Sequence, residues 1–203
     1  MNLSSMENKS SVSLNLKKNT SLDLSKKSNL RRIRVGLGWE ATVGNGANYD
    51  LDAIALLLNS KRVLNDNQDV IFYNQPNTNR GVWSEGDNRV GSYAPSDDED
   101  EETIRVELNS VPSVTQEILF VVNIFECVER HQNFGQVKNA YIRVFDDETG
   151  EELCRYDITE NFSLETTVEV AKLIRTRNGW EFKAIGEGTK ETLEAILLRY
   201  GAK

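Results

Sequence analysis

The sequence predicts an all-β fold: a β-sandwich of two antiparallel sheets with a short C-terminal helix and minor additional helical turns. Three observations lead to this prediction. Apolar and polar residues alternate with a period of two in short runs along most of the chain, which is typical of half-buried strands. Turn-forming residues separate these runs. Helical spacing of apolar residues is clear only near the C-terminus, so many short strands and one terminal helix are expected, which is typical of an all-β sandwich.

The first half of the chain contains six predicted strands. In the stretch VSLNL, Val12, Leu14 and Leu16 share one face because successive side chains of a strand point to opposite sides. The stretches SLDLS and RRIRVGLGW repeat this alternation. The more continuous apolar run AIALLLN is typical of a central strand that is buried on both faces. The predicted strands cover residues 12–16, 21–25, 31–39, 53–59, 69–74 and 103–108.

The second half continues as strands until residue 188. The run ILFVVNIFEC, at 118–127, is the longest apolar strand candidate. Turn residues around Gly150 predict a hairpin over 140–158. The segment 163–176 is compatible with a helix or a strand, and its Thr and Val content favours a strand. A last strand is predicted at 179–188.

The C-terminal stretch TKETLEAILLRYGA changes to a helical period. Leu193, Ile196 and Leu197 recur at the spacing of one helix face. Thr189 is a candidate N-cap, and Gly201 stands where helices commonly end. A short terminal helix is therefore predicted.

A single domain is predicted at 12–203, after a flexible polar N-terminal tail at 1–11. The chain has 203 residues, enough to bury a sizeable core, and no internal boundary divides it. Neither a secretory leader nor an apolar membrane span is recognisable, so we expect a cytoplasmic location. The two cysteines, Cys127 and Cys154, lie in apolar strand-like contexts and are expected to be buried free thiols.

Charge is distributed unevenly along the chain. Residues 1–34 carry eight Lys or Arg and two acids, a net +6, whereas the whole chain carries −8, so the rest carries −14. A strongly acidic body disfavours nucleic acid and attracts cations, and no nucleic-acid partner is expected. Three basic residues within the body, Arg130, Arg143 and Arg155, could pair with the acids or bind a phosphate, and surface ion pairs are the default expectation.

Catalytic motifs are absent from the sequence. The single histidine, His131, follows Cys127 by four residues, but no third residue is evident that would orient a nucleophile–base pair. The phosphate-binding glycine patterns and the serine elbow are also missing. We therefore expect a protein that is not an enzyme.

Acidic residues gather in three loop segments. Asp50 and Asp52 project to the same side of an extended chain, and Asp87 and Asn88 lie in a turn flanked by glycines. A run of six acids, 97–102, precedes the predicted strand at 103–108. Several oxygen donors at strand ends suit a hard cation such as Ca²⁺, although the EF-hand pattern is absent. A solvated acidic loop is the alternative interpretation, and the spacing alone leaves both open.

Eight stretches of this sequence occur in the order found in one known family. The chain resembles the TerD-type tellurium-resistance domains, also called stress proteins, from about residue 11 to 202. The resemblance implies a β-sandwich that binds calcium at one end and acts in cytoplasmic stress response. The stretches are VGLGWE, YDLDAIALLLN, VIFYNQ, EGDNRVG, DDEDEETIRVEL, QNFGQVKNAYIRV, GEELCRYDI and WEFKAIGEG.

The same resemblance implies a set of Ca²⁺ ligands, for more than one ion. They come from the DLD, GDN and acidic-run segments. The register of the third segment is ambiguous, because the literal DDE triplet is 97–99 whereas the spacing before Ile104 points to 100–102. The implied ligands are Asp50, Asp52, Asp87, Asn88, Asp97, Asp98, Glu99, Glu101 and Glu102.

The functional prediction that follows is a non-enzymatic binding module whose acidic loops are ordered by Ca²⁺. Other stress or tellurium-resistance proteins, or a membrane surface, are its candidate partners. A cyclic-nucleotide or other small-ligand binding protein is the alternative, and a metal-dependent hydrolase is a weaker one. The sequence does not indicate an oligomeric state.

Overall fold

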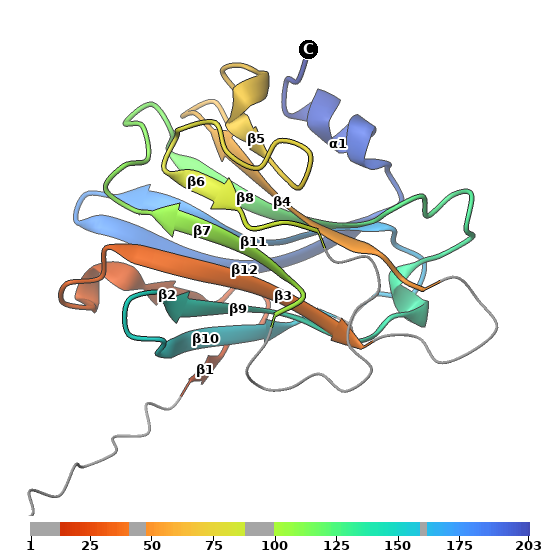
Figure 1. Cartoon of the computed structure of the whole chain (residues 1–203), viewed down its shortest axis with the longest axis horizontal. Coiled ribbons are helices and arrows are strands. Elements are labelled where there is room, and N and C mark those ends of the chain that lie inside the picture. The colour runs from red at the N-terminus through yellow and green to blue at the C-terminus, as the bar shows by residue number, and fades with distance from the viewer. Residues whose placement is uncertain (1–12, 41–47, 88–99, 159–161) are drawn as a thin grey trace, which may run out of the picture.

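Two six-stranded sheets pack face to face in a computed structural model that describes residues 13–40, 48–87, 100–158 and 162–203 (Figure 1). Sheet A has the order β1-β10-β9-β3-β7-β6, and sheet B has the order β2-β12-β11-β8-β4-β5. Neighbouring strands are antiparallel except for β1 and β10, which are parallel. The predicted β-sandwich is confirmed.

The strands are numbered along the chain. Sheet A consists of β1 (Leu14–Asn15), β3 (Arg32–Glu40), β6 (Val82–Ser84), β7 (Glu102–Glu107), β9 (Lys138–Asp146) and β10 (Glu152–Asp157). Sheet B consists of β2 (Ser21–Asp23), β4 (Leu51–Leu58), β5 (Val70–Ile71), β8 (Glu117–Ile124), β11 (Thr167–Thr176) and β12 (Gly179–Thr189).

Helical structure is minor among the described residues, as predicted. The helix α1 (Leu193–Arg199) follows β12, and Thr192, not Thr189, caps it: the Thr192 hydroxyl accepts from the Ala195 amide at 3.4 Å. The N-cap prediction at Thr189 was wrong because β12 extends through that residue. The single-turn 3₁₀ helices are η1 (Leu24–Lys26), η2 (Asn67–Asp69) and η3 (Phe134–Gln136).

The core lies between the sheets and follows from the period-two alternation. On β3, Ile33, Val35, Leu37 and Trp39 point inward and are buried. The indole of Trp39 donates a hydrogen bond to the Tyr49 carbonyl at 3.1 Å, which satisfies its one polar group. No helix in the described residues is long and apolar enough to cross a membrane.

A second apolar layer covers the outer face of sheet B. Ile54 and Leu56 of β4 pack with Ile196 and Tyr200, so α1 covers this face (Figure 1). The Tyr200 hydroxyl donates to the Glu169 carboxylate at 3.0 Å. Burial raises the pKa of Tyr200, and the neighbouring carboxylate raises it further. The helix is thus held by apolar contacts and by one buried hydrogen bond.

Several predicted boundaries differ from the structure. The strand predicted at 69–74 ends at Ile71, because Phe72 and Gln75 form a tight bridge that turns the chain. The strand β6 was not predicted, since its three residues are too few to display a period. Of the strand predicted at 12–16, Leu14–Asn15 pair with β10, and the predicted tail at 1–11 lies outside the described residues.

Both cysteines are buried free thiols, as predicted. Burial raises the pKa of Cys154 to about 12, and the nearby Glu152 carboxylate adds to the effect. Cys154 is therefore a protonated, unreactive core residue at neutral pH.

The edges of the sandwich set the position of the candidate site. The short strands β1 and β2, both from the segment 14–23, form one edge of sheet A and one edge of sheet B. At the opposite side, β5 contacts β6, and β4 contacts β7. Asp50, Asp52 and Asp87 lie close together at this second side.

Candidate metal centre

Three aspartates from two different sheets converge at the β5–β6 side. Asp50, Asp52 and Asp87 each place a carboxylate oxygen within 4.8 Å of the others. Asp50 and Asp52 are 5% and 3% exposed, whereas Asp87 is exposed. The structure thus brings together three of the residues that the sequence singled out. We call this cluster the aspartate trio.

Local pairing orients Asp50 and Asp52 at the start of β4. Asp52 lies opposite Asn123 of β8, and the Phe125 amide donates to the Asp50 carbonyl at 2.8 Å. These bonds fix the register, so both carboxylates project from the same side of the strand. Two carboxylates are therefore held close together by backbone pairing.

Asp87 reaches the trio from sheet A. It follows β6, after Gly86, whose φ of +135° is accessible to glycine and strained for other residues. The Glu85 amide donates to the Thr103 carbonyl at 3.0 Å and fixes this turn to β7. The trio therefore joins the edge of one sheet to a strand of the other.

The trio lines a hollow of about 70 Å³ whose walls include Tyr73 and Phe125. Arg130 approaches from one side, with Nη1 3.7 Å from Asp50 Oδ2 and Nη2 2.9 Å from a Glu126 oxygen. The guanidinium partly offsets the negative charge of Asp50. The sequence did not indicate Tyr73 or Phe125, because both follow strand ends and reach the hollow through tertiary packing.

A second acidic hollow adjoins the first and shares Asp87 with it. It has a volume of about 240 Å³, and Glu85, Glu101 and Glu102 also line it. Glu102 is buried, and its Oε2 accepts from the Ala53 amide at 2.6 Å, which ties β7 to β4. Glu101 is fixed through its backbone, since its amide donates to the Leu37 carbonyl at 2.8 Å.

Asp100, the fourth residue of the acidic run, is held by a buried ion pair. Its carboxylate accepts from Arg143 Nε at 2.6 Å, and the two side chains are 1% and 2% exposed. Gly36 makes room for this contact, because a Cβ there would overlap the Asp100 carboxyl group. Burial raises the pKa of Asp100, and Arg143 opposes this shift. The expectation that Arg143 forms a surface ion pair was wrong: the strand pattern does not reveal what covers an outward-facing residue.

The remaining predicted ligands lie outside the described residues. These are Asn88, Asp97, Asp98 and Glu99. Of the nine predicted ligands, the trio is therefore brought together directly, and Glu101 and Glu102 lie at the adjoining hollow.

The donor set of the trio fits a hard cation. The cluster consists of carboxylates from described residues, without His or Cys. Carboxylate oxygens suit Ca²⁺ and Mg²⁺, whereas Zn²⁺ sites usually draw on imidazole or thiolate ligands. The residues present are thus compatible with the calcium that the sequence resemblance implies.

The fold and this cluster define an acidic β-sandwich protein with a candidate hard-cation centre where its two sheets meet. A comparison with known protein families identifies one domain: the family model of the TerD domain matches residues 12–200. The chain belongs to the TerD family, whose members are described as tellurium-resistance and stress-response proteins.

Individual relatives are similar over nearly their whole length. The chain is 38% identical to the tellurium resistance protein TerD of Serratia marcescens, covering 94% of this chain and 98% of that protein. It is also 38% identical to general stress protein 16U of Bacillus subtilis (strain 168), with the same coverage. A solved homologue of telluride resistance protein (TerD) from Streptomyces coelicolor A3(2) has the same fold, with a TM-score of 0.67 at 20% identity, covering 83% of this chain and 96% of that one.

Proposed function

We propose that this protein is a calcium-binding stress-response module that acts by binding partners rather than by catalysis. The observation that carries the proposal is the aspartate trio, in which three carboxylate oxygens lie within 4.8 Å of one another. Three carboxylates at this separation repel one another unless a cation or protons offset their charge. A divalent cation is the species that suits all three donors at once.

Two features support Ca²⁺ over Mg²⁺. Ca²⁺ accepts six to eight oxygen ligands in flexible geometry, whereas Mg²⁺ demands a near-ideal octahedron and keeps several waters. The trio combines two fixed, buried carboxylates with one from an exposed turn, which suits the more flexible ion. The adjoining hollow, which shares Asp87, supports the expectation of more than one ion.

The position of the trio suggests how calcium would act on the fold. Asp52 belongs to β4 of sheet B and Asp50 directly precedes this strand, whereas Asp87 follows the edge strand β6 of sheet A. An ion held by all three would tie the two sheets together at this side. Calcium would therefore stabilise the folded state and order the turn that carries Asp87, creating a surface for a partner.

The cellular setting of this proposal is the cytoplasm, and two buried free cysteines support a reducing compartment. Stress or tellurium-resistance proteins are the favoured partners, because relatives of this chain bear those names.

Calorimetric titration of metal-free protein with Ca²⁺, repeated with Mg²⁺, tests the proposal. We expect Ca²⁺ to bind at micromolar or tighter concentration, about −8 kcal/mol, and Mg²⁺ to bind more weakly. Asp52→Asn and Asp87→Asn should each weaken the calcium isotherm at least about tenfold, since each removes a charged ligand.

Glu148→Gln is the matched control, because Glu148 is exposed in the turn between β9 and β10, away from the acidic hollows. It should leave the isotherm unchanged. Unaltered calcium affinity in both aspartate variants would contradict the assigned ligands, and no heat in the wild-type protein would contradict calcium binding itself.

A further inference from the structure

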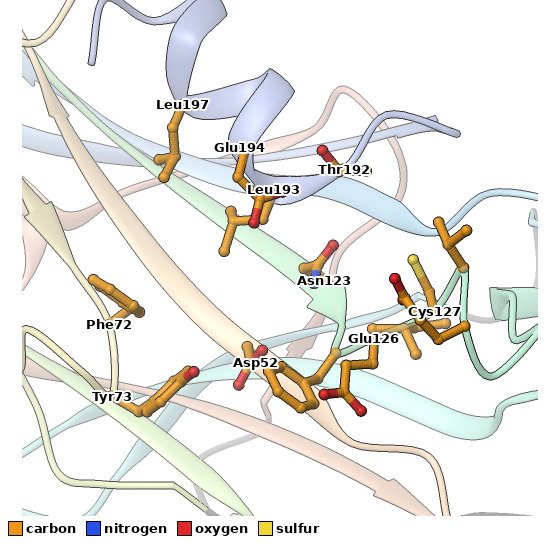
Figure 2. A pocket seen from close by; sticks show the side chains of 14 residues that line it. Asp52, Phe72, Tyr73, Asn123, Glu126, Cys127, Thr192, Leu193, Glu194 and Leu197 are labelled. Carbon is orange, nitrogen blue, oxygen red and sulfur yellow. The ribbon is translucent and has the colours of Figure 1, made fainter. Parts of the chain in front are cut away.

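A larger pocket lies beside the trio, on the outer face of sheet B. It has a volume of about 390 Å³ and opens between α1, the chain after β8 and the turn after β5 (Figure 2). We call it the helix pocket. This volume is in the range of pockets that hold small organic molecules. Of its lining residues the proposed calcium function uses only Asp52, so calcium and a ligand of this pocket would compete for that carboxylate.

Apolar and aromatic side chains form the walls of the helix pocket. Leu193 and Leu197 line it from α1, and Phe72 and Tyr73 line it from the opposite side (Figure 2). The two aromatic rings pack edge to face, with centroids 5.3 Å apart. Such walls favour a ligand with an apolar body, and the ring faces attract cations.

Two buried polar side chains lie deeper in the pocket. Asp52 and Asn123 are 3% and 6% exposed and neighbour each other across β4 and β8. The Thr167 hydroxyl lies 2.8 Å from Asn123 Oδ1 and 2.9 Å from the Glu191 carbonyl, and the Asn123 amide group lines the pocket (Figure 2). A purely apolar ligand would remove these groups from water without replacing their hydrogen bonds, at a cost in affinity.

The charge of the lining residues favours a positively charged ligand. Asp52, Glu126, Glu129 and Glu194 carry carboxylates, and none of the described residues lining the pocket is Lys, Arg or His. Arg130 pairs with Glu126 at 2.9 Å, so this one rim carboxylate is partly neutralised from outside. Glu129 and Glu194 add two further carboxylates to the rim, so the lining would repel an organic anion.

We propose that the helix pocket binds an organic ammonium ion with an apolar body. The ammonium group would lie near the Asp52 carboxylate, with the rings of Phe72 and Tyr73 beside the cation. The apolar body would pack on Leu193 and Leu197. Asn123 Nδ2 would donate to a hydroxyl or carbonyl oxygen of the ligand.

Tyramine and 4-hydroxyphenylacetate are suitable probes, because they have similar shapes and opposite charges. Metal-free protein is titrated with each at low salt, followed by calorimetry and by NMR of the Asn123 side-chain amide. We expect saturable tyramine binding with a Kd of about 1 mM or tighter. The anion should bind at least about tenfold more weakly.

Two surface variants distinguish binding in the helix pocket from nonspecific attraction of a cation to an acidic protein. Glu194→Lys reverses a charge on the pocket rim and should weaken tyramine binding about three- to tenfold. It should leave calcium binding unchanged, because Glu194 is outside both acidic hollows. Glu148→Lys makes the same charge change far from the pocket and should leave tyramine binding unchanged. Equal binding of both probes, equal effects of both variants, or no tyramine binding would overturn the proposal.

Discussion

The outer faces of the two sheets are both shielded from water, but by different means. On sheet B the face is apolar, and α1 covers it through Ile196 and Tyr200. On sheet A the face carries arginines that stack on the aromatic rings of β9. The helix α1 contributes no residue to the described lining of the two acidic hollows, whereas the arginines of sheet A contact Asp100. The second arrangement therefore links the stability of a sheet to the candidate metal centre.

The arginine–aromatic stack of sheet A runs across three strands. The Arg155 guanidinium lies 3.7 Å from the centroid of Tyr141, and Arg143 lies 4.8 Å from that of Phe145. Arg34 covers the same Phe145 ring at 4.2 Å. Each guanidinium shields a ring that would otherwise be an exposed apolar surface.

The largest expected effect comes from removing the centre of this stack. Arg143→Ala leaves the Asp100 carboxylate buried without its main partner, and should lower the free energy of unfolding by about 3–5 kcal/mol, measured by urea denaturation in chelator. The double variant Arg143→Met/Asp100→Leu replaces the pair by apolar side chains and should recover most of this loss. If the double variant is as unstable as Arg143→Ala, the buried charge is not the cause.

The matching change on sheet B is Ile196→Ala, which creates a cavity under α1. It should cost about 3 kcal/mol in the same denaturation experiment. Leu198→Ala in the same helix is the control, because Leu198 is 67% exposed and its truncation should cost little. Equal effects of the two variants would show that α1 does not depend on its buried face.

The next effect is slightly smaller: calcium should stabilise the sheet A and sheet B variants to different extents. At a free concentration of 100 times Kd, it should stabilise the wild-type protein by about 2.7 kcal/mol. Ile196→Ala should retain this gain, because α1 contributes no ligand. Arg143→Ala should lose part of it, since Asp100 would no longer be held in place beside Glu101 and Glu102. Thermal melting with and without calcium measures both, and an equal gain in the two variants would contradict the link.

The smallest effect is expected at the end of the stack. Arg155→Ala removes a partly exposed cation from the Tyr141 ring and should cost about 0.5–1 kcal/mol. Arg155→Lys should recover only part of this loss, because an ammonium cannot stack as a planar group. Full recovery in the lysine variant would indicate a simple charge effect, which denaturation in high salt can check.

Most of the fold was predictable because its strands alternate. The inward series Ile33, Val35, Leu37 and Trp39 has the same period in the sequence and in the structure. Prediction failed where few residues or a nonlocal contact decide the outcome. The strand β6 has three residues, and β5 ends where Phe72 turns the chain.

The candidate site was predictable in part for the same reason. Strand periodicity places Asp50 and Asp52 on one side, and the structure agrees. The approach of Asp87 depends on β6 lying at the edge of the other sheet, which the sequence does not specify. The burial of Arg143 and the walls formed by Tyr73 and Phe125 are likewise products of sheet packing, and local patterns carry no signal for them.

The segment 14–23 has a consequence for the order of folding during synthesis. Leu14 of β1 pairs with Cys154, and Leu22 of β2 pairs with Phe182, so two of the earliest strands have partners well over a hundred residues away. Neither can form its ladder until most of the domain has left the ribosome. Such high contact order slows folding and keeps the backbone groups of β1 and β2 unpaired in the nascent chain. The sandwich is therefore closed on this side by residues that are translated before the rest of the domain and that pair last.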